Sequence, residues 1–326
     1  MTIQSHSKAI ATSSFLLPEE GPPASADPAS GARDPWTSRA LVALEDQLIW
    51  SREWVAIGYA AQIPAVGDIL PFTVGNHGIH VERMADGSIA ARFNFVQHGG
   101  CRSIPLQCQT GTRTRCSYLS CGYSRDRVEG FPTSLNRSDP SAHHFLGFSE
   151  TPGFPVGVRL AGEVILVHLG GANPAAQGPA PIALLSGEAQ SATLEPACNW
   201  KYLWQAVLAE FERDEGAGSA LTGRNRAGLR LRAYPPNLLI LDEEGSQLSA
   251  TLQPTGINLT LLRLALRGKG GAPRALGLLA RCAERAKLAT TAADLGRNAL
   301  QREVIDWFAT RLGQSFSVPT EAGGGQ

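Results

Sequence analysis

Four of the chain's six cysteines lie between Cys101 and Cys121, and His98 stands just before them. Thiolates and imidazoles are the usual protein ligands of zinc and of iron–sulfur clusters, so a metal here would dictate how the surrounding loops fold. The spacing of the four cysteines, C-x6-C-x7-C-x4-C, differs from the standard zinc motifs. Three interpretations stay open: a metal site, reduced cysteines that pack as small apolar residues, or a disulfide that ties the loops together.

The composition of the whole chain argues against several classes of protein. Its 326 residues include 29 basic and 29 acidic side chains, so no net charge favours nucleic acid or an acidic membrane as the partner. No apolar run reaches the roughly 20 residues that a membrane-spanning helix needs. The start of the chain lacks the basic end, long apolar centre and cleavage site of a secretory signal. We therefore expect a cytoplasmic protein without a membrane segment.

The first half of the chain shows mainly strand patterns. Leucines at helical spacing predict one helix over 37–54. Alternating patterns then predict strands over 78–84 and 88–95, with a hairpin turn at Asp86–Gly87. A further strand pair over 156–169 follows the cysteine-rich stretch.

The second half mixes helices and strands after a Pro-, Ala- and Gly-rich stretch over 170–181. A helix pattern comes first, then strands with a turn at Glu244–Gly245, and then a final amphipathic helix. The apolar face expected for that last helix, and the glycine expected to end it, are Leu300, Val304, Trp307, Leu312 and Gly313.

These patterns predict an α+β protein with two domains. We expect a disordered lead-in over 1–35, a β domain with an N-terminal helix over 36–180, an α+β domain over 181–316, and a disordered tail over 317–326.

The serial order of several segments resembles that of the large (alpha) subunit of Rieske-type non-heme iron ring-hydroxylating oxygenases. The segments are EDQLIWSREWVAIGYAAQIPAVGDIL, ERMADGSIAARFNF, VGVRLAGEVILVHLG, CNWKYLWQAVLAEFE and REVIDWFATRL, and the resemblance spans roughly Trp36 to Leu312. It implies an N-terminal all-β Rieske-like domain followed by a helix-grip domain. It also implies an oligomer that works with a ferredoxin or a reductase.

The resemblance places the family's first metal centre in the cysteine-rich stretch. The family motif, Cys-x-His followed after 15 to 17 residues by Cys-x-x-His, supplies two thiolates and two imidazoles to a [2Fe–2S] cluster. Here the four positions are Val96, His98, Cys116 and Leu119. His98 and Cys116 match the motif, but valine and leucine have no ligand atom, so a standard Rieske cluster is excluded in this register.

A rebuilt centre is the remaining metal hypothesis for this domain. His98, Cys101, Cys116 and Cys121 could converge if the two loops still face each other, and Cys108 could replace one of them. Three thiolates and one imidazole suit zinc, and they could also hold a [2Fe–2S] cluster.

The second metal centre of the family is a mononuclear iron bound by two histidines and one carboxylate. His168 is the last histidine of the given sequence, so residues 169–326 contain none. The resemblance places one iron-binding histidine near Glu212, the aspartate ligand near Leu278, and the acidic-Asn pair that carries electrons between subunits at Gln205 and Ala206. We therefore expect no mononuclear iron and no catalytic residue in this domain.

Three functions follow from these expectations. The first is a catalytically degenerate homologue that acts as an accessory or regulatory subunit beside a paralogous oxygenase alpha subunit. The second is an electron-transfer protein or oxidoreductase with the rebuilt Cys/His centre. The third is a binding protein for an aromatic or apolar small molecule, with a pocket between the curved sheet and the closing helix of the second domain. A fold resemblance alone does not choose between them.

Overall fold

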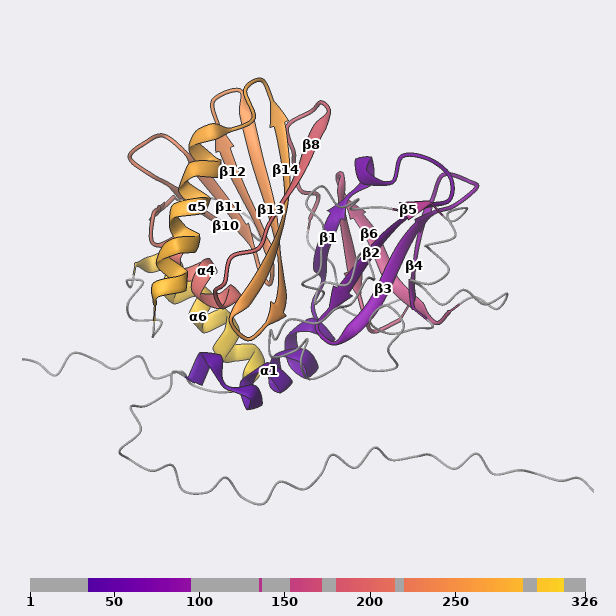
Figure 1. Ribbon diagram of the computed structural model, residues 1–326, viewed down its shortest axis with the longest axis horizontal. Coiled ribbons are helices and arrows are strands. Elements are labelled where there is room, and N and C mark those ends of the chain that lie inside the picture. Colours follow the sequence, from indigo (N-terminus) through magenta and orange to yellow (C-terminus); the bar gives the residue numbers. More distant parts are fainter. Residues whose placement is uncertain are drawn as a thin grey trace, which may run out of the picture. The chain divides into compact units, whose positions relative to one another are not determined.

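The computed structural model describes residues 35–94, 135–136, 153–171, 180–214, 220–289 and 298–313. All of them lie in one compact unit of the chain, Asp34–Gln326. They form two antiparallel sheets and a set of helices (Figure 1). This combination confirms the predicted α+β fold class.

Short helical segments open the described part of the chain: η1 (Pro35–Thr37), α1 (Arg39–Glu45) and η2 (Asp46–Trp50). The Ser38 side chain accepts a hydrogen bond from the backbone N–H of Leu41, one of the donors that a first helical turn leaves without a helical partner. The helix predicted over 37–54 is therefore present, but it ends at Trp50, before strand β1.

The first sheet has the strand order β1-β7-β6-β4-β3-β2-β5. Its strands are β1 (Val55–Tyr59), β2 (Asp68–Val74), β3 (His77–Arg83), β4 (Ile89–Phe93), β5 (Leu135–Asn136), β6 (Pro155–Ala161) and β7 (Val164–His168), with the short turn η3 (Ala60–Gln62) after β1. The predicted turn at Asp86–Gly87 joins β3 to β4, and Gly87 has a φ of 80°, a conformation that glycine adopts without steric cost.

The second sheet has the strand order β8-β14-β13-β12-β11-β10-β9. Its strands are β8 (Ala189–Leu194), β9 (Glu212–Arg213), β10 (Leu221–Arg224), β11 (Arg230–Tyr234), β12 (Leu238–Glu243), β13 (Ser246–Gly256) and β14 (Leu259–Gly268). The predicted turn at Glu244–Gly245 is confirmed, because Glu243 and Ser246 are paired at the end of the β12–β13 hairpin.

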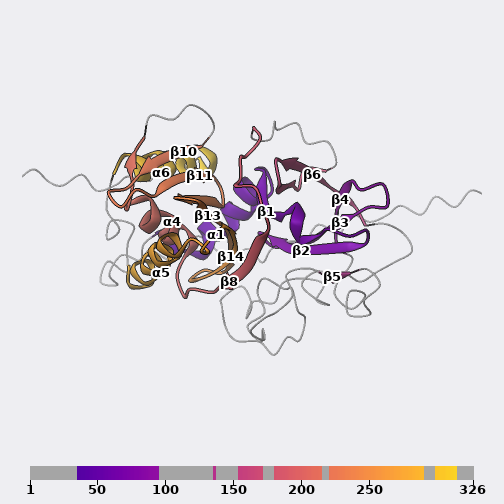
Figure 2. The ribbon, with the colours of Figure 1, turned by 90° about the horizontal axis from the view of Figure 1, so that it is seen from above.

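Three helices pack on one face of the second sheet: α4 (Trp200–Leu208), α5 (Pro273–Leu288) and α6 (Ala299–Leu312). Figure 2 shows α4 between α5 and α6. All nine residues of α4 are buried, and the Asn199 side chain caps its first turn by accepting a hydrogen bond from the Lys201 N–H. No helix in the described part of the chain is long and apolar enough to cross a lipid bilayer.

Helix α6 differs in one detail from its predicted apolar face. Leu300, Val304 and Leu312 are buried as expected, and Gly313 ends the helix in the left-handed conformation. However, Phe308 rather than Trp307 completes the buried face. Trp307 lies one position away around the helix and is only partly buried, because it lines a pocket described below.

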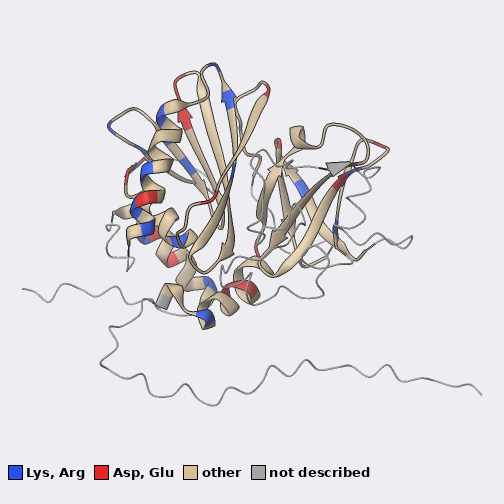
Figure 3. Cartoon of the chain, in the orientation of Figure 1, with Lys and Arg blue, Asp and Glu red and all other residues tan. Residues whose placement is uncertain are grey.

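Charged residues are frequent along α5, whereas most residues of the strands in both sheets are uncharged (Figure 3). The exposed charged residues of this helix include Arg274, Arg281, Glu284, Arg285 and Lys287. The opposite face of α5 is buried and mostly apolar. This amphipathic pattern is the one expected of a helix that covers a sheet.

A buried ion pair connects the N-terminal helical segments to α4. The Lys201 Nζ lies 2.5 Å from the Glu45 Oε1, and both side chains are only 2% exposed. The indole N–H of Trp200 donates to the other Glu45 oxygen at 3.2 Å. Because an unpaired charge in an apolar core is far more costly than a paired one, the two elements depend on each other.

We expect Lys201→Met to lower the free energy of unfolding by about 3–5 kcal/mol, because it leaves the Glu45 carboxylate buried without its cation. The double variant Glu45→Leu/Lys201→Met should lose less, because it removes both charges. Chemical denaturation followed by tryptophan fluorescence measures both values.

The matched control for this experiment is Lys287→Met, because Lys287 is half-exposed and pairs with Glu284 on the surface of α5. It should change the free energy of unfolding by about 0–1 kcal/mol. Equal losses for Lys201→Met and Lys287→Met would contradict the structural role of the buried pair.

A buried asparagine joins the first sheet to the second. The Asn237 amide accepts from the Ala56 N–H at 3.0 Å and donates to the Ala56 carbonyl at 2.8 Å, as a neighbouring strand would. It also donates to the Leu252 carbonyl on β13 at 3.2 Å. Asn237 therefore satisfies the backbone of β1 at the place where β1 leaves its own sheet's hydrogen-bond register.

Candidate functional site

The predicted Cys/His centre lies outside the described residues. This holds for the proposed ligands His98, Cys101, Cys108, Cys116 and Cys121. It also holds for Val96 and Leu119, the two motif positions without a ligand atom. The rebuilt zinc or [2Fe–2S] site therefore stays a prediction.

The family positions of the second domain lie on three different elements. Gln205 and Ala206 are buried in α4, Leu278 is buried in α5, and Glu212 is exposed on β9. The Gln205 carbonyl accepts a hydrogen bond from the Gln301 side chain. The backbone groups of α4 are thus satisfied by protein, and no side chain at these positions other than Glu212 carries a hard anionic ligand for iron.

A ferrous ion of the family type does not fit these residues. Near the two expected ligand positions stand the isobutyl group of Leu278, which is buried, and the carboxylate of Glu212, which faces solvent. Within the described residues, no group of three or more histidine, cysteine or acidic side chains is arranged to hold a metal ion.

The face of the second sheet that α4 covers is filled by apolar side chains. Leu248, Ala250 and Leu252 of β13 belong to one continuous core that also contains Trp204 and Leu278. This core fills the space between α4 and the sheet. A pocket lies instead beside the closing helix α6, whose residues line it together with residues of β10, β11 and β12.

Two cysteines of this core are chemically inert. Burial raises the pKa of the Cys198 thiol to about 12, and the charge of Glu284 raises it further, while a hydrogen bond with Thr260 opposes the rise. Burial likewise raises the pKa of Cys282 to about 12, helped by the charge of Glu210. The Cys282 thiol donates to the Ala206 carbonyl at 3.5 Å. Neither thiol provides a thiolate at neutral pH.

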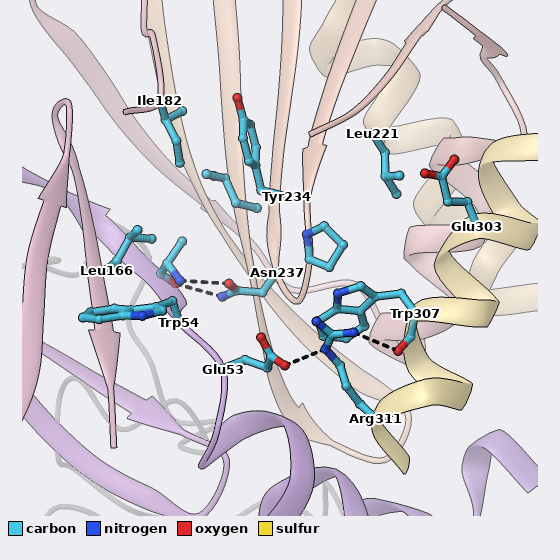
Figure 4. Close-up of a pocket in the computed structure, with 13 residues that line it drawn as sticks. Glu53, Trp54, Leu166, Ile182, Leu221, Tyr234, Asn237, Glu303, Trp307 and Arg311 are labelled. Carbon is cyan, nitrogen blue, oxygen red and sulfur yellow. Dashed lines mark hydrogen bonds and ion pairs between the residues drawn. The ribbon is translucent and has the colours of Figure 1, made fainter. Parts of the chain in front are cut away.

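A pocket of 340 Å³ lies where α6, the β11–β12 turn and strand β1 meet (Figure 4). We call it the Trp54–Trp307 pocket. Its aromatic walls are Trp54, Tyr234 and Trp307. Its apolar walls are Ala56, Leu166, Ile182, Leu221, Pro235 and Leu238. Most known small-molecule sites are apolar cavities of similar or larger size with a few polar groups.

An ion pair forms one edge of the pocket, and the other polar lining residues, Tyr234, Asn237 and Glu303, lie around its walls (Figure 4). The Arg311 Nε donates to the Glu53 Oε1 at 2.5 Å, and the guanidinium lies over the Trp307 ring, 3.9 Å from its centroid. Figure 4 shows Glu53, Arg311 and Trp307 side by side. Glu303, also in the wall, pairs with Arg213 at 2.9 Å. The pocket thus combines an apolar interior with a fixed charged pair at its edge.

Sequence reasoning missed this pocket because its parts are distant in the chain. Glu53 and Arg311 are separated by 258 positions, and nothing in the local pattern of either indicates the other. The one local signal is Trp307, an aromatic residue near a helix C-terminus, which the helical spacing alone places on the apolar face of α6.

Comparisons with known proteins place the chain in a family context. No protein-family model matches it. The chlorobenzene dioxygenase alpha subunit of a Cupriavidus species and the biphenyl 2,3-dioxygenase alpha subunit of Rhodococcus jostii are each 30% identical to it over 99 residues, which are 30% of this chain. The matched part is 22% of the length of each of these relatives, so the chain spans about a fifth of them.

A solved structure supports the fold over a longer stretch. A quaternary ammonium Rieske monooxygenase in complex with L-carnitine matches with a TM-score of 0.50 at 11% identity, covering 80% of this chain and 84% of the other. The chain is a homologue of the Rieske oxygenase alpha subunits. This Rieske oxygenase homologue shares the fold of that structure, and residues 169–326 of its sequence contain no histidine.

We expect Cys198 and Cys282 of the native protein to resist alkylation by iodoacetamide at pH 8, because the thiolate is the reactive form and both thiols are buried with a pKa near 12. Peptide mass spectrometry measures the extent of modification at each cysteine. The same reaction in denaturant should modify both and serves as the control. Rapid modification of either residue in the native protein would contradict its placement in the core.

The raised thiol pKa values also predict a loss of stability in alkali. An unfolded thiol ionises near pH 8.5–9, so the native state holds the extra protons above that range. The stabilisation is therefore complete below about pH 8.5 and is lost as the pH rises toward about 12. Replacing both cysteines by alanine should remove this part of the pH dependence of the free energy of unfolding, which chemical denaturation at a series of alkaline pH values measures.

Proposed function

We propose that this Rieske oxygenase homologue is catalytically degenerate and acts as an accessory or regulatory subunit of an oxygenase system. One observation carries the proposal: residues 169–326, which form the second sheet and its helices, contain no histidine. An iron that needs two imidazoles has no ligands in that part of the chain.

The packing of the second sheet supports the same proposal. The apolar core behind α4 leaves Gln205 and Ala206 enclosed by protein, where the family's electron-carrying pair would stand. Neither an amide nor a methyl group carries the charge of the acidic-Asn pair. A subunit of this kind keeps a fold capable of assembly while contributing no iron centre of its own in this domain.

The partner in this proposal is a paralogous oxygenase alpha subunit. The curated relatives are themselves described as subunits of dioxygenases. A ferredoxin or a reductase is the partner under the alternative in which the first domain holds a rebuilt [2Fe–2S] centre at His98, Cys101, Cys116 and Cys121. Zinc at these residues would instead make the centre structural.

Metal analysis and a visible spectrum of protein purified without oxygen test the proposal. We expect any bound iron or zinc to be lost in Cys116→Ser and retained in Cys282→Ser, the matched control in the second domain. We also expect no oxygen consumption by the chain alone with aromatic substrates and a reductant. A ferrous ion that survives Cys116→Ser, or a hydroxylated product made by this chain alone, would overturn the proposal.

A second candidate function, small-molecule binding, is favoured by the Trp54–Trp307 pocket. Its aromatic and apolar walls suit an aromatic or apolar ligand, and the Glu53–Arg311 pair could orient a polar group on that ligand. This candidate requires no metal and is compatible with a regulatory subunit.

Tryptophan fluorescence titration with small phenols and aromatic hydrocarbons tests this second candidate. We expect saturable quenching of the tryptophan fluorescence. It should be lost in the double variant Leu221→Trp/Trp307→Leu, because both residues line the pocket. The control Leu160→Trp adds an indole on β6, outside the pocket, and should leave the titration unchanged. The same quenching in both variants would show that the probes bind elsewhere.

A further inference from the structure

The outward face of strand β13 is polar and yet buried. Every second residue of the strand points to this face. These residues are polar and at most 3% exposed: Gln247, Ser249, Thr251, Gln253 and Thr255. Such alternation normally indicates that one face of an antiparallel sheet is in water. We call these five residues, with Arg263 and Arg267 of β14, the polar stripe.

The arginines belong to the same face because of the strand register. Arg267 is paired with Gln247 and Arg263 with Thr251 across the β13–β14 ladder, so each pair of side chains points to the same side. Both arginines are almost fully buried. Between them on the ladder, Ala265 faces Ser249, the position with the smallest side chains of the stripe.

Residues of the first sheet cover the polar stripe. The Arg267 guanidinium lies over the Tyr59 ring, 4.9 Å from its centroid, and the Arg263 guanidinium lies over the Phe72 ring at 4.8 Å. The Arg267 Nη2 also donates to the Glu163 Oε2 at 3.0 Å. The stripe is therefore enclosed by protein.

Several donors of the stripe have no hydrogen-bond partner among the described residues. They include the Nε and Nη1 groups of Arg267 and the amide nitrogen of Gln253. Among the described residues, the buried hydroxyl of Thr255 is in the same state, whereas the hydroxyl of Tyr59 interacts with those of Ser249 and Thr251. Nitrogen donors can be satisfied only by an acceptor, and each one left unsatisfied in a protein interior is destabilising. Within the described residues, the Arg267 guanidinium therefore has two buried donors that require an acceptor.

The charge of the region is also incompletely neutralised. Arginine keeps its proton in proteins, and the Arg267 side chain is 0% exposed, whereas its carboxylate partner Glu163 is 50% exposed. Tyr59 does not supply a negative charge, because burial raises the pKa of its phenol, although the hydroxyls of Ser249 and Thr251 and the charge of Arg267 oppose the rise. A water molecule could accept hydrogen bonds here but would bring no charge.

We propose that the polar stripe binds a small monovalent anion with the size and charge of chloride, held at the Nε and Nη1 edge of Arg267. The anion accepts from the guanidinium and from the hydroxyls nearby, among which Tyr59 is the contribution of the first sheet. It thereby supplies both missing properties, acceptors and negative charge, and it ties β14 to β1.

Thermal unfolding at constant ionic strength, with chloride replacing the bulky anion gluconate, tests the proposal. The Tm of the full chain should rise with chloride concentration and saturate, as expected for a ligand that binds only the native state. Arg267→Met should abolish this dependence. The control Arg213→Met removes an arginine that also pairs with a carboxylate but is 57% exposed, and it should retain the dependence.

A milder variant covers the case in which Arg267→Met does not fold. Tyr59→Phe removes a single hydroxyl and no charge, and it should raise the half-saturating chloride concentration by about tenfold. In crystals grown with bromide, an anomalous peak should lie within hydrogen-bond distance of the Arg267 guanidinium. A Tm indifferent to chloride, or an unchanged chloride dependence in Tyr59→Phe, would mean that water satisfies these donors and would overturn the proposal.

Discussion

The buried Glu45–Lys201 pair fixes the end of α1 against the first turn of α4. Its two residues are 156 positions apart, yet both side chains are only 2% exposed. Separating them would leave two charges in an apolar core, which costs far more than the pair itself contributes. Because Lys201 lies in the first turn of α4, the same pair sets the position of Gln205 and Ala206, one turn further along the helix.

The second sheet has two buried faces of opposite chemistry. The face toward α4 is apolar and forms a continuous core. The face toward the first sheet combines an apolar cluster, which includes Ile240 and Ala265, with the polar stripe. Burying polar groups is tolerable only where they find partners, and Asn237 shows how completely this can be done. Arg267 shows the opposite case, with donors left over on the same face of the sheet.

The two faces bear differently on function. On the helix side, the resemblance places the family's aspartate ligand near Leu278 and its electron-carrying pair at Gln205 and Ala206, and all three side chains are buried. On the other side, the sheet offers polar groups and, at its edge, the Trp54–Trp307 pocket. The candidate ligand sites of this homologue are therefore the polar stripe and the Trp54–Trp307 pocket, and neither uses the family's iron-binding positions.

Local sequence patterns suffice to predict the α+β class and the hairpin turns at Gly87 and Gly245, and the sequence also shows that no imidazole follows His168. These follow from local periodicity, from the conformational freedom of glycine and from ligand chemistry, none of which depends on distant residues. Only the tertiary structure decided that Trp307 leaves the core, that Arg311 meets Glu53, and that the polar face of β13 is buried. Those outcomes depend on which surfaces pack together, and alternation along a strand reports two faces without stating what covers each.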